Sequence, residues 1–339
     1  EFCERAEAND FSADICSYAR NGIGALLSED VKELCPVGGF PKPDLLVATS
    51  YCTPIIKWFE VASQMYDIPM ILLDFPFIHD GASQDEMDRA VALMREQIDD
   101  EIIFLEKFTG KRFDYDGLQQ SLSVTSEMHK LWADTLKLAQ AVPAPISCFD
   151  LFIQLFPVTC MRGDPRGVAY YEKFNAEVAQ RVKQGIGAIP NEKFRLYWDN
   201  LPIWFKMRDL SLEFAAYDAN VVTALYPFIW ALPLKTDSPL DSIAESLTLG
   251  INNRGVKQRA DFVTNLVKDY SIDGLVMQMS RSCKLMCLGQ FDTIEQVEKK
   301  LGVPGVILEA DMCDARQYSE AQVKLRIQAF IELLASKKQ

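Results

Sequence analysis

The sequence predicts an α/β protein with two domains, whose parallel sheets are flanked by helices and joined by a helical region. Two observations support this class: a strand–helix–strand pattern occurs twice, and its strands are continuously apolar rather than alternating. Such strands are typical of parallel sheets that are covered on both faces. Because 339 residues suffice for two domains, we place an N-terminal α/β domain at 1–140 and a C-terminal α/β domain at 141–339.

The first strand–helix–strand unit lies near the start of the chain. Residues 44–49 form a continuous apolar strand, 55–66 read as a helix, and 68–75 form a second buried run. The chain begins with Glu1 and carries neither an initiator Met nor an apolar signal segment. We therefore expect this domain to lack its N-terminal segment.

Helices dominate the middle of the chain. Ser83 and Glu86 form an S-x-x-E capping box, and apolar residues at helical spacing continue to Gly110, where we expect the helix to end. Two more helices are predicted at 118–141 and 166–184. The domain boundary therefore falls within a helical region.

The second half of the chain predicts a four-stranded parallel sheet. The strand candidates are 195–198, 220–225, 273–277 and 303–308. Helices are expected around 203–216 and at 290–301. The chain closes with an S-x-x-Q capping box at Ser319 and Gln322, followed by apolar residues on one helical face. We expect this last helix to cover the sheet.

The charge balance excludes several classes of partner. Lys and Arg number 35 against 48 Asp and Glu, which gives a formal net charge of −13. We therefore expect no binding to nucleic acid or to an anionic membrane, and no apolar run approaches the roughly 20 residues that span a bilayer. Nine cysteines without the pattern of a disulfide scaffold favour a cytoplasmic setting.

Motifs for nucleotide binding and for simple hydrolysis are incomplete. Gly22-Ile23-Gly24 lacks the third glycine of a dinucleotide loop, and Gly110-Lys111 has Leu105 where a Walker loop needs glycine. We predict that neither motif binds a nucleotide. A cysteine hydrolase needs a positioned base, and the chain has only His79 and His129. His129 lies in a helical run and is predicted to be a surface or packed residue.

The cysteines are the better candidates for chemistry. Cys52 and Cys283 each follow the first strand of a strand–helix–strand unit, where ligands of open α/β sheets collect. Cys16 lies near Arg20, which favours a thiolate. Three thiolates in one crevice can hold three irons of a cubane cluster and leave the fourth iron open. The alternative is that the cysteines are small buried hydrophobes, which we expect of Cys3, Cys35, Cys148 and Cys160.

These residues resemble the iron-sulfur subunits of 2-hydroxyacyl-CoA dehydratases and ATP-dependent (class I) benzoyl-CoA reductases, of the dehydratase-α or reductase-B type. The resemblance spans essentially the whole chain. Its most specific segments are Cys16-Ser17-Tyr18-Ala19-Arg20, Pro43-Asp44-Leu45-Leu46 with Cys52 and Lys57-Trp58-Phe59-Glu60, Arg281-Ser282-Cys283-Lys284, and Asp311-Met312-Cys313-Asp314-Ala315-Arg316.

The resemblance implies a cofactor, partners and a set of site residues. Cys16, Cys52 and Cys283 map onto the three cysteine ligands of one [4Fe-4S] cluster. Cys287 and Cys313 are further candidate ligands, because a branch of the family carries a double-cubane cluster. The implied partners are a homologous second catalytic subunit, an ATP-hydrolysing iron-sulfur activator protein and a CoA-thioester substrate. Tyr51 and Arg20 are candidate contacts to the cluster or substrate, and no residue is assigned as the proton donor.

The resemblance leaves the reaction open between two kinds. Thr49-Ser50-Tyr51 and Gln278 stand where dehydratase α subunits tend to place Asn-Asn-Ile and a His, so we lean to electron transfer to an aromatic acyl-CoA, as in benzoyl-CoA reductase. The first alternative is an (R)-2-hydroxyacyl-CoA dehydratase subunit, which eliminates water through a ketyl radical. A double-cubane reductase and a structural subunit without a cluster are the others.

Overall fold

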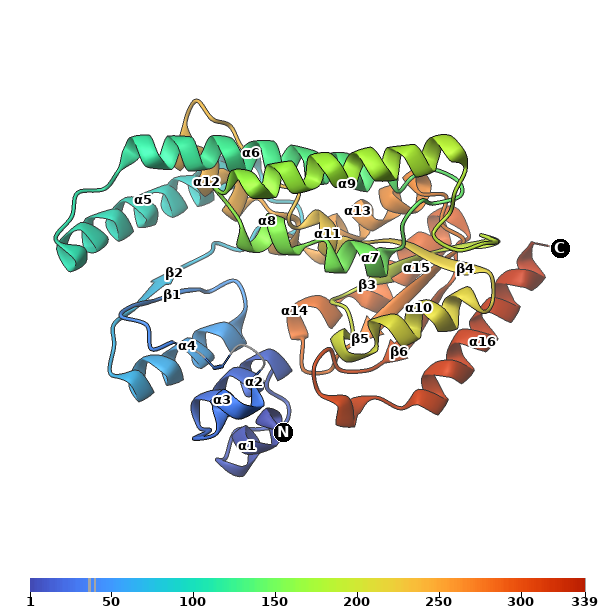
Figure 1. The fold of residues 1–339 in the computed structure, drawn as a ribbon, viewed down its shortest axis with the longest axis horizontal. Helices are drawn as coiled ribbons and strands as arrows, with labels where there is room; N and C mark the ends of the chain where they lie inside the picture. Colours follow the sequence, from blue (N-terminus) through green and yellow to red (C-terminus); the bar gives the residue numbers. More distant parts are fainter. Residues whose placement is uncertain (36–37, 40, 339) are drawn as a thin grey trace.

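Six parallel strands form two separate sheets in the computed structural model, which describes residues 1–35, 38–39 and 41–338 (Figure 1). β1 (Leu46–Thr49) pairs with β2 (Met70–Leu73) in a two-stranded sheet. The other four strands lie in the order β4-β3-β5-β6. Both sheets are flanked by helices, so the predicted α/β class with parallel sheets is confirmed.

The small sheet is accompanied by four helices from the N-terminal part of the described chain. α4 (Thr53–Tyr66) connects the two strands, and α1 (Phe2–Ala8), α2 (Ser17–Leu26) and α3 (Val31–Leu34) precede them. Two glycines let these helices approach closely: a Cβ on Gly24 would lie 1.9 Å from the carbonyl oxygen of Phe2, and one on Gly22 would lie 2.2 Å from the ring of Trp58. The Gly-x-Gly segment therefore packs helices.

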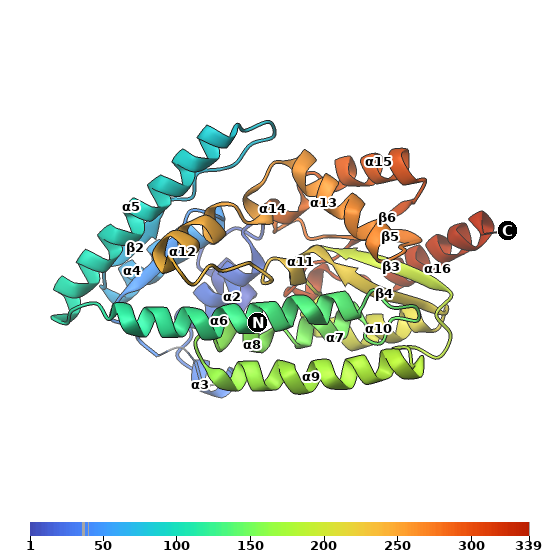
Figure 2. The ribbon, with the colours of Figure 1, turned by 90° about the horizontal axis from the view of Figure 1, so that it is seen from above.

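Long helices form a layer above the two sheets in the view of Figure 1. They are α5 (Gln84–Thr109), α6 (Tyr115–Leu138) and α9 (Pro165–Gln184), with the short α7 (Cys148–Ile153) and α8 (Phe156–Cys160) between the last two. α6 and α9 run side by side in Figures 1 and 2. The capping box of Ser83 and Glu86 is present, and α5 ends at Gly110 with a φ of 68°. Both predictions are confirmed.

The large sheet consists of β3 (Phe194–Asp199), β4 (Ala219–Ala224), β5 (Gly274–Met279) and β6 (Gly305–Glu309), as the second half of the sequence predicts. Every residue of β3 and β4 is buried, which explains why these strands are continuously apolar apart from a few polar residues. The helices around this sheet are α10 (Met207–Ala215), α11 (Leu225–Phe228), α12 (Pro239–Thr248), α13 (Val256–Asp269), α14 (Lys284–Cys287), α15 (Gln290–Leu301) and α16 (Glu320–Lys337).

Helices cover the large sheet on both faces. A Cβ on Gly274 would meet Phe330 of α16 at 2.6 Å, whereas one on Gly305 would meet Ile294 of α15 at 2.7 Å. Leu275 pairs with Gly305, and successive residues of a strand face opposite sides. α16 and α15 therefore lie on opposite faces, and the prediction that the last helix covers the sheet is confirmed.

One expected helix cap is absent. Ser319 precedes α16, but its side chain makes no capping hydrogen bond. The predicted S-x-x-Q box is therefore wrong, and α16 is held by the burial of Val323, Ile327, Ile331 and Leu334 against the sheet. Among the described residues, no helix is long and apolar enough to cross a membrane.

Candidate functional site

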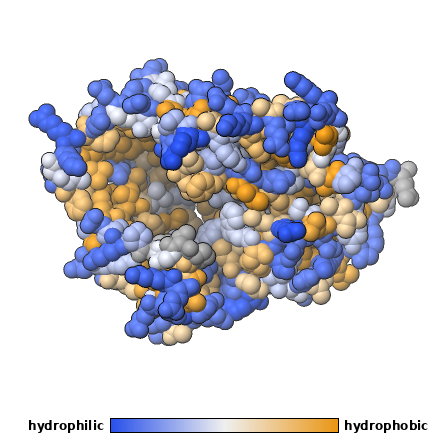
Figure 3. Space-filling view, in the orientation of Figure 1, coloured by the Kyte–Doolittle hydropathy of each residue, from blue (hydrophilic) through white to orange (hydrophobic). Residues whose placement is uncertain are grey.

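Cys16, Cys52 and Cys283 line one cavity of about 700 Å³. The cavity lies between the small sheet with its helices and the layer that contains α6 and α12. Figure 3 shows a hollow on this side of the molecule whose walls are largely hydrophobic. The structure thus brings together three thiols that the sequence places at opposite ends of the chain.

Each of these cysteines is the residue directly before a helix. Cys16 precedes α2, Cys52 precedes α4, and Cys283 precedes the short α14. The first backbone amides of a helix have no partner within the helix and carry partial positive charge. The cavity is therefore bordered by amide groups that favour negative charge on sulfur.

Burial and the backbone act on the three thiols in opposite directions. Burial raises the pKa of Cys52 to about 11, while the amide of Ile55 acts to lower that pKa. Burial also raises the pKa of Cys16 and of Cys283, and backbone amides again oppose the shift. Burial therefore favours the protonated form of all three free thiols.

A buried carboxylate connects two of the cysteine segments. Asp311 is 1% exposed and accepts hydrogen bonds from the hydroxyl groups of Ser282 at 2.5 Å and Ser280 at 3.2 Å. The Ser282 hydroxyl in turn accepts from the backbone amide of Ser17 at 3.3 Å. Residues adjacent to Cys283 and Cys16 are thus tied to one another through Asp311. The sequence alone assigns Asp311 no role, although it lies in one of the segments that carry the resemblance.

Arg20 lies in a separate buried ion network. Its side chain is fully buried, and Nη1 donates to Glu7 at 2.5 Å and to Asp314 at 2.9 Å. Arg316 binds the same two carboxylates. Arg20 is not among the residues that line the cavity. It fixes α2, which starts directly after Cys16, against the segment that follows β6.

Cys287 and Cys313 are also outside the set of residues that line the cavity. The Cys287 thiol donates to the carbonyl oxygen of Ser280 at 2.9 Å. Burial raises the pKa of both thiols to about 12. Within the described residues, no three His, Cys, Asp or Glu side chains gather closely enough to hold a single metal ion.

The remaining four cysteines differ in their burial. Cys3 and Cys148 are buried, as expected of core residues. The prediction is wrong for Cys160, which is exposed, because it is the last residue of α8 and bonds only to its neighbour Thr159. Cys35 is half-buried.

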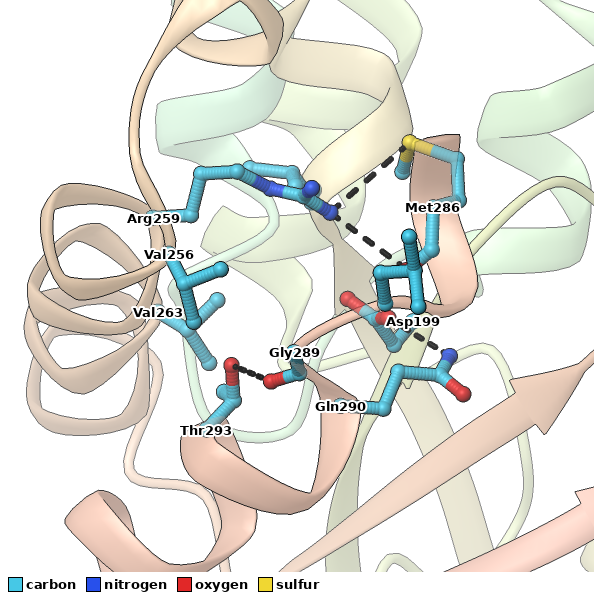
Figure 4. A pocket seen from close by; sticks show the side chains of 10 residues that line it. Asp199, Val256, Arg259, Val263, Met286, Gly289, Gln290 and Thr293 are labelled. Atoms are coloured by element: carbon cyan, nitrogen blue, oxygen red, sulfur yellow. Dashed lines mark hydrogen bonds between the residues drawn. The ribbon is translucent and has the colours of Figure 1, made fainter. Parts of the chain in front are cut away.

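Contacts behind α14 hold the Cys283 segment in place (Figure 4). Arg259 of α13 donates to the carbonyl oxygen of Leu285 at 2.8 Å, and it also contacts Met286. Gln290 donates to Asp199 at 2.8 Å. These residues border a second cavity of about 10 Å³, which is the size of one water molecule. This second cavity is too small for a substrate.

Tyr51 lines the large cavity next to Cys52. Its hydroxyl group is buried and has no hydrogen-bond partner among the described residues. Its ring packs edge-on against Phe75 with a centroid distance of 5.8 Å. Burial raises its pKa, so the group remains a phenol at neutral pH.

Apolar and aromatic side chains form most of the remaining wall. They include Trp58, Phe75, Leu122, Tyr226, Ile229, Trp230, Ile243, Leu247 and Ile251. His129 is buried and packed, as one of the two predicted placements has it, but it also lines the cavity. The spacing of Ser121, Thr125 and His129 places them on one face of α6. This pattern could have indicated from the sequence that His129 shares a polar helix face.

Comparisons with known proteins agree over the whole chain. The family model described as 2-hydroxyglutaryl-CoA dehydratase, D-component, matches residues 1–334. The chain is 30% identical to the (R)-2-hydroxyisocaproyl-CoA dehydratase alpha subunit of Clostridioides difficile, over 100% of this chain and 82% of that protein. It is 30% identical to the (R)-phenyllactyl-CoA dehydratase alpha subunit of Clostridium sporogenes, over 99% and 81%. It is 29% identical to the B-type subunit of benzoyl-CoA reductase from Thauera aromatica, over 98% and 79%.

Proposed function

The chain belongs to the 2-hydroxyglutaryl-CoA dehydratase, D-component family, and on that premise we propose that it is an iron-sulfur subunit of an acyl-CoA enzyme. The observation that carries this proposal is the meeting of Cys16, Cys52 and Cys283 in one large cavity. If these cysteines were only core residues, we would not expect all three to line the same cavity, each at the start of a different helix.

The three thiols are donors of the kind that iron-sulfur clusters use, and they border a cavity of about 700 Å³. A [4Fe-4S] cluster held by three cysteines supplies one-electron transfer at low potential and leaves one iron without a protein ligand. The bordering amides stabilise its negative charge and that of the thiolates.

Cys287 and Cys313 remain candidates for a double-cubane cluster. Both are half-buried and close enough to other thiols for their charges to interact, Cys287 with Cys283 and Cys313 with Cys16. Neither lines the cavity. A single cluster on Cys16, Cys52 and Cys283 is therefore the primary proposal.

The enzyme is proposed to need two protein partners. The relatives are named as alpha or B-type subunits, which supports a second, homologous catalytic subunit. An ATP-hydrolysing activator is proposed as the electron source. The two glycine motifs of this chain serve other purposes, since Gly22 and Gly24 pack helices and Gly110 ends α5.

Reduction of an aromatic acyl group is the first candidate reaction. The rings of Trp58, Phe75 and Trp230 on the cavity wall suit a planar apolar group. A net reduction consumes protons, and Tyr51, which lines the cavity next to Cys52, is a candidate donor if its buried hydroxyl turns towards the substrate. Dehydration of a 2-hydroxyacyl group is the second candidate, supported by the names of the relatives at 30% identity. Product analysis separates them, because dehydration consumes no electrons overall.

The test is iron and acid-labile sulfide per chain, on protein purified without oxygen. About four irons per chain are expected for one cubane, and about twice as many for a double cubane. Cys16→Ser, Cys52→Ser and Cys283→Ser should each lose the iron and the EPR signal of the reduced protein. Cys160→Ser is the matched control, because Cys160 is exposed and outside the cavity. An iron-free wild type would instead indicate a structural subunit without a cluster.

A further inference from the structure

The thiol of Cys287 lies one helical turn beyond Cys283 and contacts the backbone of the same loop. It donates to the carbonyl oxygen of Ser280 at 2.9 Å. The amide of Cys283 donates to that carbonyl oxygen as well, also at 2.9 Å, and the amide of Cys287 donates to the carbonyl oxygen of Cys283 at 3.1 Å. Cys283 is thus enclosed in a ring of three hydrogen bonds, and the Cys287 thiol closes this ring.

A second partner holds the same thiol from the large sheet. Asn200 directly follows β3 and is fully buried. Its Nδ2 donates to the sulfur of Cys287 at 3.4 Å and to the carbonyl oxygen of Gln278 at 3.0 Å. Its φ of 79° lies in the left-handed region, which Asn adopts more readily than most residues. The turn after β3 therefore holds the loop after β5 through Cys287.

The next polar residue along the chain makes a parallel connection. Gln290 donates from Nε2 to Asp199, the last residue of β3, at 2.8 Å (Figure 4). The same Nε2 donates to the carbonyl oxygen of Gln278 at 3.0 Å. Asp199 and Asn200 thus fasten α14 from the end of β3, one through Gln290 and the other through Cys287.

Both hydrogen-bonding functions of the Cys287 thiol are in use. A thiol offers one weak donor and a weak acceptor, and here the donor meets Ser280 and the acceptor meets Asn200. Burial raises the pKa of this thiol to about 12, so the sulfur keeps its proton at neutral pH. Cys287 does not line the cavity that Cys283 borders. Its thiol is therefore engaged by contacts within the protein.

We propose that Cys287 is a positioning residue, whose thiol donates to the Ser280 carbonyl and fixes the loop from which Cys283 faces the cavity. A thiolate that binds iron has no proton to donate, so a Cys287 that served as a cluster ligand would lose its hydrogen bond to Ser280. The ring around Cys283 would then open. This inference rests on the proposed function, because it assigns Cys287 a role towards the cluster ligand Cys283 and removes Cys287 from the candidate ligands.

Infrared spectroscopy of the S–H stretch tests the donation directly. An S–H group that donates a hydrogen bond absorbs at a lower frequency than a free one, and an iron-bound thiolate has no S–H band. We would record the difference spectrum between the wild type and Cys287→Ser, in the iron-free chain and in protein purified without oxygen. Cys148→Ser gives the reference band, because the buried Cys148 thiol has no hydrogen-bond partner among the described residues.

The expected band of Cys287 lies at a lower frequency than that of Cys148 and is present in both preparations. A band at the frequency of Cys148 would overturn the inference, because the thiol would then donate to nothing. A band that is present in the iron-free chain and absent from the iron-loaded protein would also overturn it and would make Cys287 a ligand.

Iron retention measures the effect on Cys283. Cys287→Ala removes the donor, and we expect a chelator to strip its iron at a concentration about tenfold or more below that needed for the wild type. Cys287→Ser restores a donor to Ser280 and should retain iron as the wild type does. Cys148→Ala is the matched control, since it removes a buried thiol that does not line the cavity. Loss of iron from Cys287→Ser, or equal retention in Cys287→Ala and Cys148→Ala, would contradict the positioning role.

The outcome is distinguishable from that of the proposed function. A chain that shows the lowered S–H band but binds no iron keeps the donor role of Cys287 in its loop and overturns the iron-sulfur proposal. A chain that binds iron and then lacks the S–H band of Cys287 does the reverse.

Discussion

The hydroxyl group of Ser282 donates a 2.5 Å hydrogen bond to the buried carboxylate of Asp311. The same hydroxyl accepts from the amide of Ser17, so this one pair joins the residue before Cys283 to the residue after Cys16. Asp311 also accepts from the amides of Cys313 and Asp314, both at 2.9 Å. The relative position of two cysteines thus depends on one carboxylate.

Asp311→Asn should loosen this arrangement. The amide group of Asn keeps the shape of the carboxylate but replaces one acceptor oxygen by a donor, which faces the donors that Asp311 now satisfies. We expect a loss of about 1–3 kcal/mol in the free energy of unfolding and a lower iron content per chain. Chemical denaturation and iron analysis check this. Asp292→Asn at the exposed start of α15 is the control, and equal iron in both variants would contradict a positioning role.

Tyr51→Phe should separate proton delivery from cluster binding. The change removes only the hydroxyl, which has no partner among the described residues, so iron content and thermal stability should stay as in the wild type. If Tyr51 delivers a proton, the rate of aromatic reduction should fall about 10²-fold or more. Tyr115→Phe is the control at a tyrosine that is 56% exposed. An unchanged rate would remove Tyr51 from the mechanism.

The stability of the protein should depend on pH through His129. Its folded-state pKa of about 4 lies below the ordinary value of 6.5, so the unfolded chain binds the proton more readily. Stability from this group is therefore complete above pH 6.5 and is lost as pH falls towards 4, by an amount on the order of 3 kcal/mol. The difference in unfolding free energy between wild type and His129→Asn, measured from pH 7 to pH 4, should narrow accordingly. A difference that is constant with pH would show that the ring titrates normally.

Gly24→Ala should disrupt the packing of α1 on α2. The added Cβ would lie 1.9 Å from the carbonyl oxygen of Phe2, which belongs to the backbone and can yield only if α1 moves. We expect a loss of about 1–3 kcal/mol and a lower melting temperature. In Gly250→Ala the nearest atom is 3.4 Å away, so that variant should melt close to the wild type.

Periodicity in the sequence predicts the elements of the fold well. Continuous apolar runs identify the strands of the large sheet, because a strand buried on both faces needs apolar residues throughout. The capping box predicted at Ser319 does not form, because a cap depends on the side-chain rotamer as well as on the residue type. Gly22-Ile23-Gly24 shows a related limit. Glycine spacing alone does not tell a phosphate loop from close helix packing, which depends on Phe2 and Trp58.

The candidate site is predictable only in part. The positions of Cys52 and Cys283 after strands predict that they face a crevice, and the structure brings Cys16 to them. Arg20 beside Cys16 does not line the cavity, and its guanidinium is bound by Glu7 and Asp314 instead. The packed placement of His129 is predicted, but its position at the cavity is not, because its partner, the Leu232 carbonyl, is a backbone group far along the chain.

The start of α14 lies far along the chain from the starts of α2 and α4. The three cysteines can therefore line one cavity only after both parts of the chain have folded. A nascent or truncated chain that ends before β5 contains two of the three thiols and has no large sheet to position a third. Any group that binds all three cysteines stabilises only the fully assembled chain, since binding to the native state alone shifts the folding equilibrium. A group bound to all three cysteines would join the N-terminal helices to the large sheet.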